Sequence, residues 1–304
     1  MKPVQVLWHI NVGLSMRKIW LVSTDHLEEE LWFRDEEDFK VAMNFVAIQA
    51  ACCPKVIVLA FILMSNHVHF VLKGERKDVK EFISMFKRRY SVYFNAKWGL
   101  MKLLKRNGVD VKEIPYDDDA VERAIAYVQM NCVAANICSH PSQYPWGTGN
   151  SFFSQTKRSG IQLKELSARA RERILHSNCD SMPCNWSIKP DGYISPQEYV
   201  DVKAVEAIFR SPKRMNFFLN TSSKARKRLE SEEHLPAFRD QIILAALPDL
   251  CRSLFQKESF QTLSPSEQAE FMRQIRFRFS ADVNQIARVC SLSYADAARL
   301  IDSI

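Results

Sequence analysis

The chain has 304 residues, of which 47% are hydrophobic and 25% are charged, and its formal net charge is +7. This composition excludes a low-complexity chain and is typical of a globular protein with room for two domains. The longest apolar run, residues 56–64, is too short to cross a bilayer, and the N-terminus has no signal-peptide pattern. We therefore expect a cytoplasmic protein without membrane contact, with reduced cysteines, since none of the eight forms a CxxC pair.

The first half of the chain alternates between strand-like and helix-like segments. The hydrophobic pattern predicts strands at 4–13, 18–23, 56–64, 67–73 and 108–114, and helices at 35–51, 78–99 and 117–137. Only Ser65 and Asn66 separate two of these strands, which indicates a tight hairpin, and Gly99 is a plausible helix C-cap. The order of elements predicts an α+β fold with an antiparallel sheet, in a domain that spans residues 1–155.

The second half, residues 156–304, is expected to be a mostly helical DNA-binding region. Near its end, at 282–304, small and apolar residues fall where a helix-turn-helix requires them, and Ser293 and Asp296 have capping-box spacing. These residues are Ile286, Ala287, Leu292, Ala297, Leu300 and Ile301. An ordinary helical hairpin fits the pattern equally well.

Basic residues gather in one stretch of the second half. Residues 203–228 hold eight Lys or Arg and one acidic residue, with Phe and Asn between them, which suits a phosphate backbone. A solvated helix face is an equally good interpretation of such a charge run. The candidate DNA contacts are Lys87, Arg88, Arg89, Lys213, Arg214, Lys224, Arg226, Lys227, Arg228 and Arg299.

The sequence FILMSNHVHFVLKG carries two histidines, His67 and His69, in a run that is otherwise apolar. Alternate side chains of a strand share a face, so these imidazoles point the same way, about 7 Å apart along the strand. Two imidazoles on one face can share a metal ion, but two structural histidines are also compatible with so short a motif. A histidine-triad hydrolase is excluded, because Val71 stands where its third histidine would be.

The helix predicted at 117–137 offers further polar groups. Its apolar stripe is flanked by Tyr127 and Asn131, which are four residues apart and therefore lie on one helix face. If this helix packs beside the histidine strand, His67, His69 and Asn131 can hold a divalent cation, with Tyr127 directed at whatever the metal polarises. Asp119 and Glu122 have the spacing of a capping box at the start of the same helix.

The sequence NHVHFVL resembles the paired-histidine motif of the HUH endonuclease superfamily. The stretch AYVQMNCVAANICSHPSQYPWGTGNSFF is similar to the tyrosine motif of single-tyrosine HUH transposases, and most of all to REP-associated tyrosine transposases, relatives of the insertion-sequence-200/605 type. The resemblance covers roughly residues 5–155. Cys132 stands where the family usually has Pro, and Ser65 stands where Pro often precedes the Asn-His pair.

The resemblance implies a ferredoxin-like sheet, Mg²⁺ or Mn²⁺ held by His67, His69 and Asn131, and Tyr127 as the nucleophile. It implies cleavage of hairpin-bearing single-stranded DNA through a 5′-phosphotyrosine, followed by strand transfer. Whether the chain acts as a homodimer, and whether Tyr127 serves its own subunit, stays open. Tyr90 and Tyr93 are expected to pack or to contact DNA, and the carboxylates beside Tyr116 disfavour it as a nucleophile.

Two other functions remain compatible with the sequence. A domesticated regulator would bind DNA or RNA without cutting it, and a metal-dependent phosphohydrolase would use water as the nucleophile. The phosphohydrolase predicts that Tyr127→Phe stays active, whereas the transposase predicts complete loss of cleavage.

Overall fold

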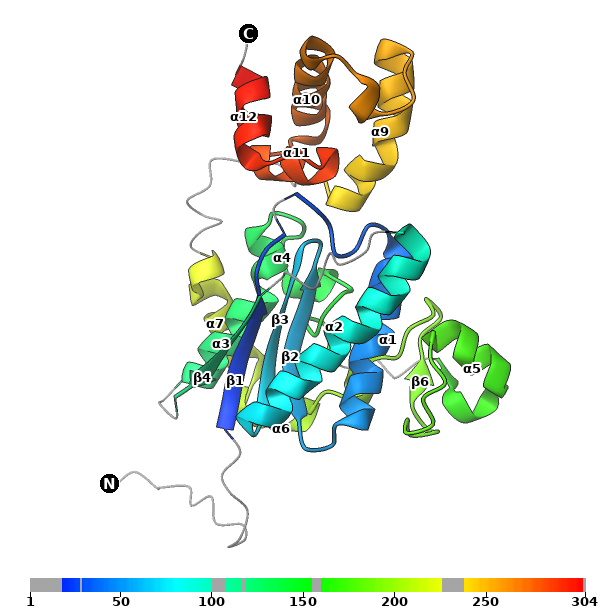
Figure 1. Cartoon of the computed structure of the whole chain (residues 1–304). Helices are drawn as coiled ribbons and strands as arrows, with labels where there is room; N and C mark the ends of the chain where they lie inside the picture. Colours follow the sequence, from blue (N-terminus) through cyan, green and yellow to red (C-terminus); the bar gives the residue numbers. More distant parts are fainter. Residues whose placement is uncertain are drawn as a thin grey trace, which may run out of the picture.

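A computed structural model describes residues 18–27, 29–99, 108–115, 119–154, 160–225 and 238–302 (Figure 1). The sheet-bearing part contains β1 (Lys18–Thr24), α1 (Glu36–Cys52), β2 (Ile57–Met64), β3 (His67–Gly74), α2 (Arg76–Trp98), β4 (Val109–Ile114), α3 (Ala120–Gln129) and α4 (Asn131–Ala134). The following segment contains β5 (Ile161–Gln162), α5 (Ala168–Leu175), β6 (Ser187–Ile188), α6 (Val202–Phe209) and α7 (Pro212–Thr221). The last helices are α9 (Asp240–Phe255), α10 (Pro265–Phe279), α11 (Val283–Cys290) and α12 (Tyr294–Asp302). The strand predicted at 4–13, Tyr116 and Arg226 to Arg228 lie outside the described residues.

The core of the molecule is a four-stranded antiparallel sheet with the strand order β2-β3-β1-β4. The elements follow one another as β–α–β–β–α–β, and β3 is inserted between β1 and β2. The predicted α+β fold with an antiparallel sheet is thereby confirmed. Within the described ranges, no helix has both the length and the apolar character that a membrane crossing demands.

Helices cover both faces of the sheet (Figure 1). On one face, α1 packs against α2, and Phe70 of β3 meets Phe82 and Phe86 of α2 in edge-on ring contacts. On the other face, α3 packs against β2 and β3 and is itself covered by α6 and α7. Because alternate residues of β3 face opposite ways, Phe70 points to α2 whereas His69 points to α3.

The segment Tyr144–Thr148 runs along the outer edge of β2. The Leu63 amide donates to the Trp146 carbonyl (2.8 Å), and the Thr148 amide donates to the Phe61 carbonyl (3.1 Å). Gly147 allows this close approach, because a Cβ at that position would lie 2.8 Å from the Phe61 carbonyl oxygen. The segment therefore occupies hydrogen-bonding groups that an edge strand would otherwise expose.

The buried apolar side chains form two separate clusters. One extends from Ile19 to Ala225 and includes residues of β6, α6 and α7 as well as the sheet. The other extends from Ile243 to Ile301 and is built by α9 to α12. The packing therefore groups residues 160–225 with the sheet, while the domain boundary near residue 155 stays a prediction.

A helical hairpin lies at the predicted helix-turn-helix. Ser291, between α11 and α12, adopts a left-handed conformation with φ of 55°. The Ser293 hydroxyl accepts a hydrogen bond from the Asp296 amide (3.1 Å) and so caps α12. Ile286, Ala287 and Ala297 are fully buried in the hairpin. The predicted pair of helices is present, and its contact with duplex DNA stays a prediction.

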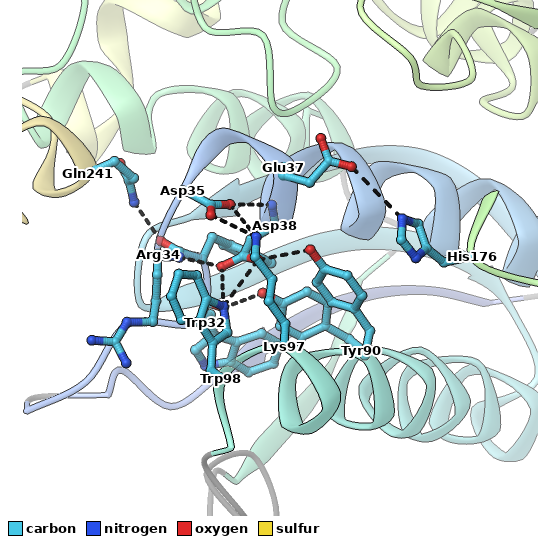
Figure 2. A network of polar contacts seen from close by, with 12 residues as sticks. Trp32, Arg34, Asp35, Glu37, Asp38, Tyr90, Lys97, Trp98, His176 and Gln241 are labelled. Carbon is cyan, nitrogen blue, oxygen red and sulfur yellow. Dashed lines mark hydrogen bonds and ion pairs between the residues drawn. The ribbon is translucent and has the colours of Figure 1, made fainter. Parts of the chain in front are cut away.

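A buried carboxylate ties the start of α1 to the end of α2 (Figure 2). Asp38, which has no exposed surface, accepts hydrogen bonds from Lys97 Nζ (2.8 Å) and Trp98 Nε1 (3.0 Å). It also accepts from the Arg34 amide and the Tyr93 hydroxyl. Next to this network, Gln241 of α9 donates to the Phe33 carbonyl (2.7 Å), which links the C-terminal helices to the sheet-bearing part.

Replacement of Asp38 by Ala is expected to lower the free energy of unfolding by about 3 kcal/mol, because it leaves buried donors and a partly buried ammonium without their acceptor. Urea unfolding followed by circular dichroism measures this change. The matched control is Glu37→Ala, which removes an exposed carboxylate 3.9 Å from His176 and should cost less than about 0.5 kcal/mol. Equal losses in the two variants would contradict the role of Asp38.

Candidate metal and nucleophile site

The two histidines of β3 lie side by side on the face covered by α3. In the sheet register, His69 pairs with Ser23 of β1 and Ile62 of β2, while His67 pairs with Met64. The two rings meet edge to face with their centroids 4.9 Å apart. Both side chains are buried, with 6% of His67 and 3% of His69 exposed. The prediction that they share a face is confirmed.

One nitrogen of each imidazole is hydrogen-bonded and the other is not. Nδ1 of His67 lies 2.8 Å from Asn66 Oδ1, and Nδ1 of His69 lies 2.8 Å from Ser23 Oγ. Both Nε2 atoms are buried without a hydrogen-bond partner among the described residues. A buried imidazole nitrogen without a partner costs free energy, and a metal-bound histidine typically engages its other nitrogen in this way. The donor set therefore fits a metal ion bound through the two Nε2 atoms.

A third histidine, His26, completes this cluster. Its ring stacks on that of His67, with centroids 3.7 Å apart and planes inclined by 9°. One nitrogen from each of His26, His67 and His69 lies within 4.8 Å of the others. His26 is not among the residues predicted from the sequence, although an antiparallel pairing of the strands at 18–23 and 67–73 brings the residues that follow Ser23 next to His67.

Tyr127, the predicted nucleophile, projects from α3 toward the histidines. Its half-buried ring lies edge-on to that of His69, with 5.7 Å between the centroids. The rival tyrosines are used otherwise: Tyr90 is fully buried and donates to the Trp32 carbonyl, and Tyr93 donates to Asp38. Within the described residues, Tyr127 is therefore the tyrosine whose ring contacts this cluster.

Asn131 lies one turn after Tyr127, but the helix is interrupted between the two. The single helix predicted at 117–137 is wrong, since α3 ends at Gln129 and α4 begins at Asn131. The Asn131 side-chain amide donates to the carbonyls of Tyr127 (2.9 Å) and Val128 (3.1 Å). These bonds compete with the backbone hydrogen bonds that a continuous helix would make to the same carbonyls. Asn131 borders the same cavity as His67, while its role as a metal ligand stays a prediction.

The capping box predicted at Asp119 and Glu122 is also wrong. Asp119 has a left-handed backbone with φ of 71° and makes no side-chain capping bond. Instead, Arg214 of α7 forms ion pairs with Asp119 and with Glu122 (3.0 Å). Arg214 thus joins α7 to the start of α3. Arg214 is one of the predicted DNA contacts, and these ion pairs give its charge a partner within the protein.

Burial controls the charge state of the cluster. Burial, followed by the neighbouring His69 and His26, holds the pKa of His67 well below its usual range. Burial, followed by the ammonium of Lys224, lowers the pKa of His69 to about 3. Burial also raises the pKa of the Tyr127 phenol. The imidazoles of His67 and His69 are therefore neutral near pH 7, with lone pairs available to a metal, and a phenol in this position would require activation to act as a nucleophile.

Lys224 brings a positive charge to this site from outside the sheet-bearing half. Its Nζ lies 4.8 Å from the centroid of the Tyr127 ring. An ammonium over an aromatic face is attracted by the ring quadrupole, and this attraction grows when the ring belongs to a phenolate. The sequence singled out Lys224 only as one member of a basic run, and the structure brings it next to the predicted nucleophile.

A cavity of about 600 Å³ opens between this cluster and the C-terminal helices. From the sheet-bearing part it is lined by His26, His67 and Asn131, and from the C-terminal part by Arg239, Asn284 and Arg288. Arg288 forms an ion pair with the buried Asp240 (3.1 Å), which fixes α11 against the start of α9. The helices predicted to bind DNA thus border the histidine site.

The other predicted DNA contacts are scattered. Lys87, Arg88 and Arg89 lie on α2, which packs on the opposite face of the sheet from α3. Lys213 is exposed on α7, and Arg299 is exposed on α12, where it pairs with Asp296 (2.7 Å). Of the described candidates, Lys224 is the one that reaches the histidine and tyrosine cluster.

Comparison with known proteins adds one likeness. No protein-family model and no curated protein sequence matches this chain. Among solved structures, the chain is similar to one described as a REP-associated tyrosine transposase bound to a REP hairpin. The two chains are 12% identical, the alignment covers 60% of this chain and 93% of the other, and the TM-score is 0.33.

Burial of neutral His69 predicts a loss of stability in mild acid. On folding, the pKa of His69 falls from its ordinary 6.5 to about 3. Between these two pH values the His69 imidazole is protonated in the unfolded chain but not in the folded protein, so the free energy of unfolding decreases as the pH drops from 6.5 toward 3. We expect His69→Gln to remove about 2 kcal/mol of the difference in unfolding free energy between pH 7.5 and about pH 5. Urea titrations with a chelator present measure this difference, with exposed His140→Gln as the control. An unchanged pH dependence in His69→Gln would contradict the burial of a neutral imidazole.

Proposed function

We propose that this chain is a metal-dependent single-stranded DNA endonuclease and strand transferase of the HUH transposase type, built on a ferredoxin-like sheet. The observation that carries the proposal is the Tyr127 ring lying 5.7 Å from the His69 ring, beside two imidazoles whose buried Nε2 atoms lack partners. Together these groups supply a nucleophile and a metal-binding set. The resemblance of both sequence motifs to REP-associated tyrosine transposases supports hairpin-bearing DNA as the substrate.

The side chains of the chain have distinct roles in this reaction. His67 and His69 would hold Mg²⁺ or Mn²⁺, with Asn131 as a further ligand, and the bound ion would neutralise charge on the scissile phosphate. The Tyr127 oxygen forms a bond to phosphorus while the bond from phosphorus to the 3′ oxygen breaks. The products are a 5′-phosphotyrosine and a 3′-hydroxyl, and attack by a second 3′-hydroxyl reverses the step and joins strands.

The phenol must lose its proton at a site where burial raises its pKa. Lys224, whose Nζ lies 4.8 Å from the ring centroid, favours the phenolate over the neutral phenol. The same ammonium lies close enough to lower the pKa of His69 and so helps to keep that ligand neutral. In this proposal Lys224 is a positioning residue that stabilises developing negative charge beside Tyr127.

Formation of a covalent adduct tests the proposal. We expect labelled single-stranded hairpin oligonucleotides incubated with the protein and Mn²⁺ to yield a protein–DNA adduct that survives denaturation. Tyr127→Phe should abolish the adduct, because it removes the attacking oxygen, whereas the matched control Tyr93→Phe should retain it. Denaturing gel electrophoresis separates the adduct, and cleavage without an adduct in Tyr127→Phe would identify a water-using phosphohydrolase instead.

A non-cleaving nucleic-acid-binding regulator is the second candidate function. It is favoured by the enclosure of the Nε2 atoms of His67 and His69 and by the C-terminal helices that border the same cavity. This function predicts that the protein binds hairpin DNA in a gel-shift assay. It also predicts that no covalent adduct forms, even with Mn²⁺ present and with hairpins that carry different flanking sequences.

Loss of the Lys224 charge should slow the covalent step. We expect Lys224→Gln to lower the single-turnover rate of adduct formation about tenfold, equivalent to about 1.4 kcal/mol of transition-state stabilisation. The loss should be smaller at high pH, where the phenol ionises without assistance. Lys213→Gln removes an exposed charge from α7 and is the matched control, expected to change DNA binding but not the rate from bound substrate. Equal rates for Lys224→Gln and the unmodified protein would rule out this role.

A further inference from the structure

We infer that His26, His67 and His69 form a three-imidazole metal site that selects a first-row transition metal over Mg²⁺. This inference rests on the proposed function for the purpose of the metal, and it changes both the ligand set and the metal expected. The ligand set predicted from the sequence has Asn131, an oxygen donor, as the third ligand, and accepts Mg²⁺ and Mn²⁺ equally.

The backbone around His26 is fixed beside the start of β3. On one side of it, the Asp25 amide donates to the Gly108 carbonyl (3.1 Å). On the other side, the Leu27 amide donates to the Asn66 carbonyl (3.0 Å), and the Asn66 side chain donates back to the Leu27 carbonyl (2.8 Å). Asn66 also contacts His67 through its Oδ1. One residue therefore orients the His67 ring and anchors the loop that carries His26.

The three rings converge on one space. His26 stacks on His67 at 3.7 Å, His67 meets His69 edge to face at 4.9 Å, and the ligand nitrogens lie within 4.8 Å of one another. Nδ1 of both strand histidines is engaged, so their Nε2 atoms are the donors that remain. His26 is exposed, and without any movement one of its ring nitrogens already lies within 4.8 Å of a ligand nitrogen of each strand histidine.

The donor chemistry decides the metal. Mg²⁺ is a hard cation that prefers oxygen ligands and water, whereas imidazole nitrogens favour Zn²⁺, Ni²⁺, Co²⁺ and Fe²⁺. The Asn131 amide NH₂ donates to two backbone carbonyls, which holds that side chain against its own helix. Three nitrogen donors with at most one amide oxygen therefore place this site among the transition-metal sites. Affinity should rise from Mg²⁺ through Mn²⁺ to Co²⁺.

Metal binding to the full chain tests this inference without any DNA. Isothermal titration calorimetry with Co²⁺, Mn²⁺ and Mg²⁺ should give affinities in that descending order. His26→Ala should weaken Co²⁺ binding by at least about tenfold. Removal of a residue that only hydrogen-bonds to a metal ligand typically costs about that much, and removal of a ligand should cost no less. The visible absorption of the Co²⁺ complex should change in the same variant, because it reports the number of nitrogen ligands. His140→Ala, which removes an exposed imidazole outside the cluster, should leave both measurements unchanged.

A second variant separates ligation from ring stacking. His26→Asp replaces the nitrogen donor by a carboxylate and should shift the preference back toward Mn²⁺ and Mg²⁺, whereas a residue that only stacks on His67 has no such effect. Unchanged Co²⁺ affinity and spectrum in both His26 variants, with binding lost in His67→Ala, would overturn the inference and leave the proposed function intact. Failure of the proposed function is a different result, namely normal three-histidine metal binding with no Tyr127-dependent adduct.

Discussion

The site depends on the antiparallel pairing of β1 with β3, which places Ser23 opposite His69. Paired residues share a face, so this register gives His69 a hydroxyl partner for Nδ1 and directs its Nε2 toward α3. A shift by one residue would turn both imidazoles toward α2, into the space now filled by Phe70 and its neighbours. The sheet register thus determines the orientation and the burial of the strand histidines together.

The burial of these imidazoles has a cost that an ordinary core would avoid. Each buried Nε2 without a partner loses its hydrogen bond to water, and valine or leucine at the same positions would pack without that loss. The surrounding structure offsets the cost with extensive apolar packing, since Val68, Phe70 and Leu72 on the opposite face of β3 have no exposed surface. A strand with one fully apolar face and two unsatisfied imidazoles on the other is more typical of a binding site than of a packing solution.

Sequence reasoning predicted what depends on local periodicity and missed what depends on contacts between distant segments. The two apolar runs on either side of Ser65 and Asn66 located β2 and β3, and the four-residue spacing put Tyr127 and Asn131 on neighbouring turns. His26 had no local signal, because its relevance comes from a strand pairing across more than forty residues. The capping box at Asp119 failed because Arg214, distant in sequence, takes the same carboxylates. The helix break at Met130 depends on the Asn131 side chain, which donates to a backbone carbonyl of the helix. Helix propensities of single residues do not include such a bond.

The proposed role of Tyr127 as a nucleophile connects the two halves of the chain. Its position on α3 is set by the sheet-bearing part, but burial there raises the phenol pKa and opposes the ionisation that a nucleophile requires. In the proposed reaction, two charges would offset this effect: a metal ion held by the histidines on one side, and Lys224, which follows α7, on the other. Residues 160–225 pack into the same core as the sheet, so they hold Lys224 at a fixed distance from the ring. In the proposed reaction this segment therefore belongs to the catalytic unit, since without it the phenol would be buried beside the neutral imidazoles of His67 and His69, and a metal ion alone would have to supply the compensating charge.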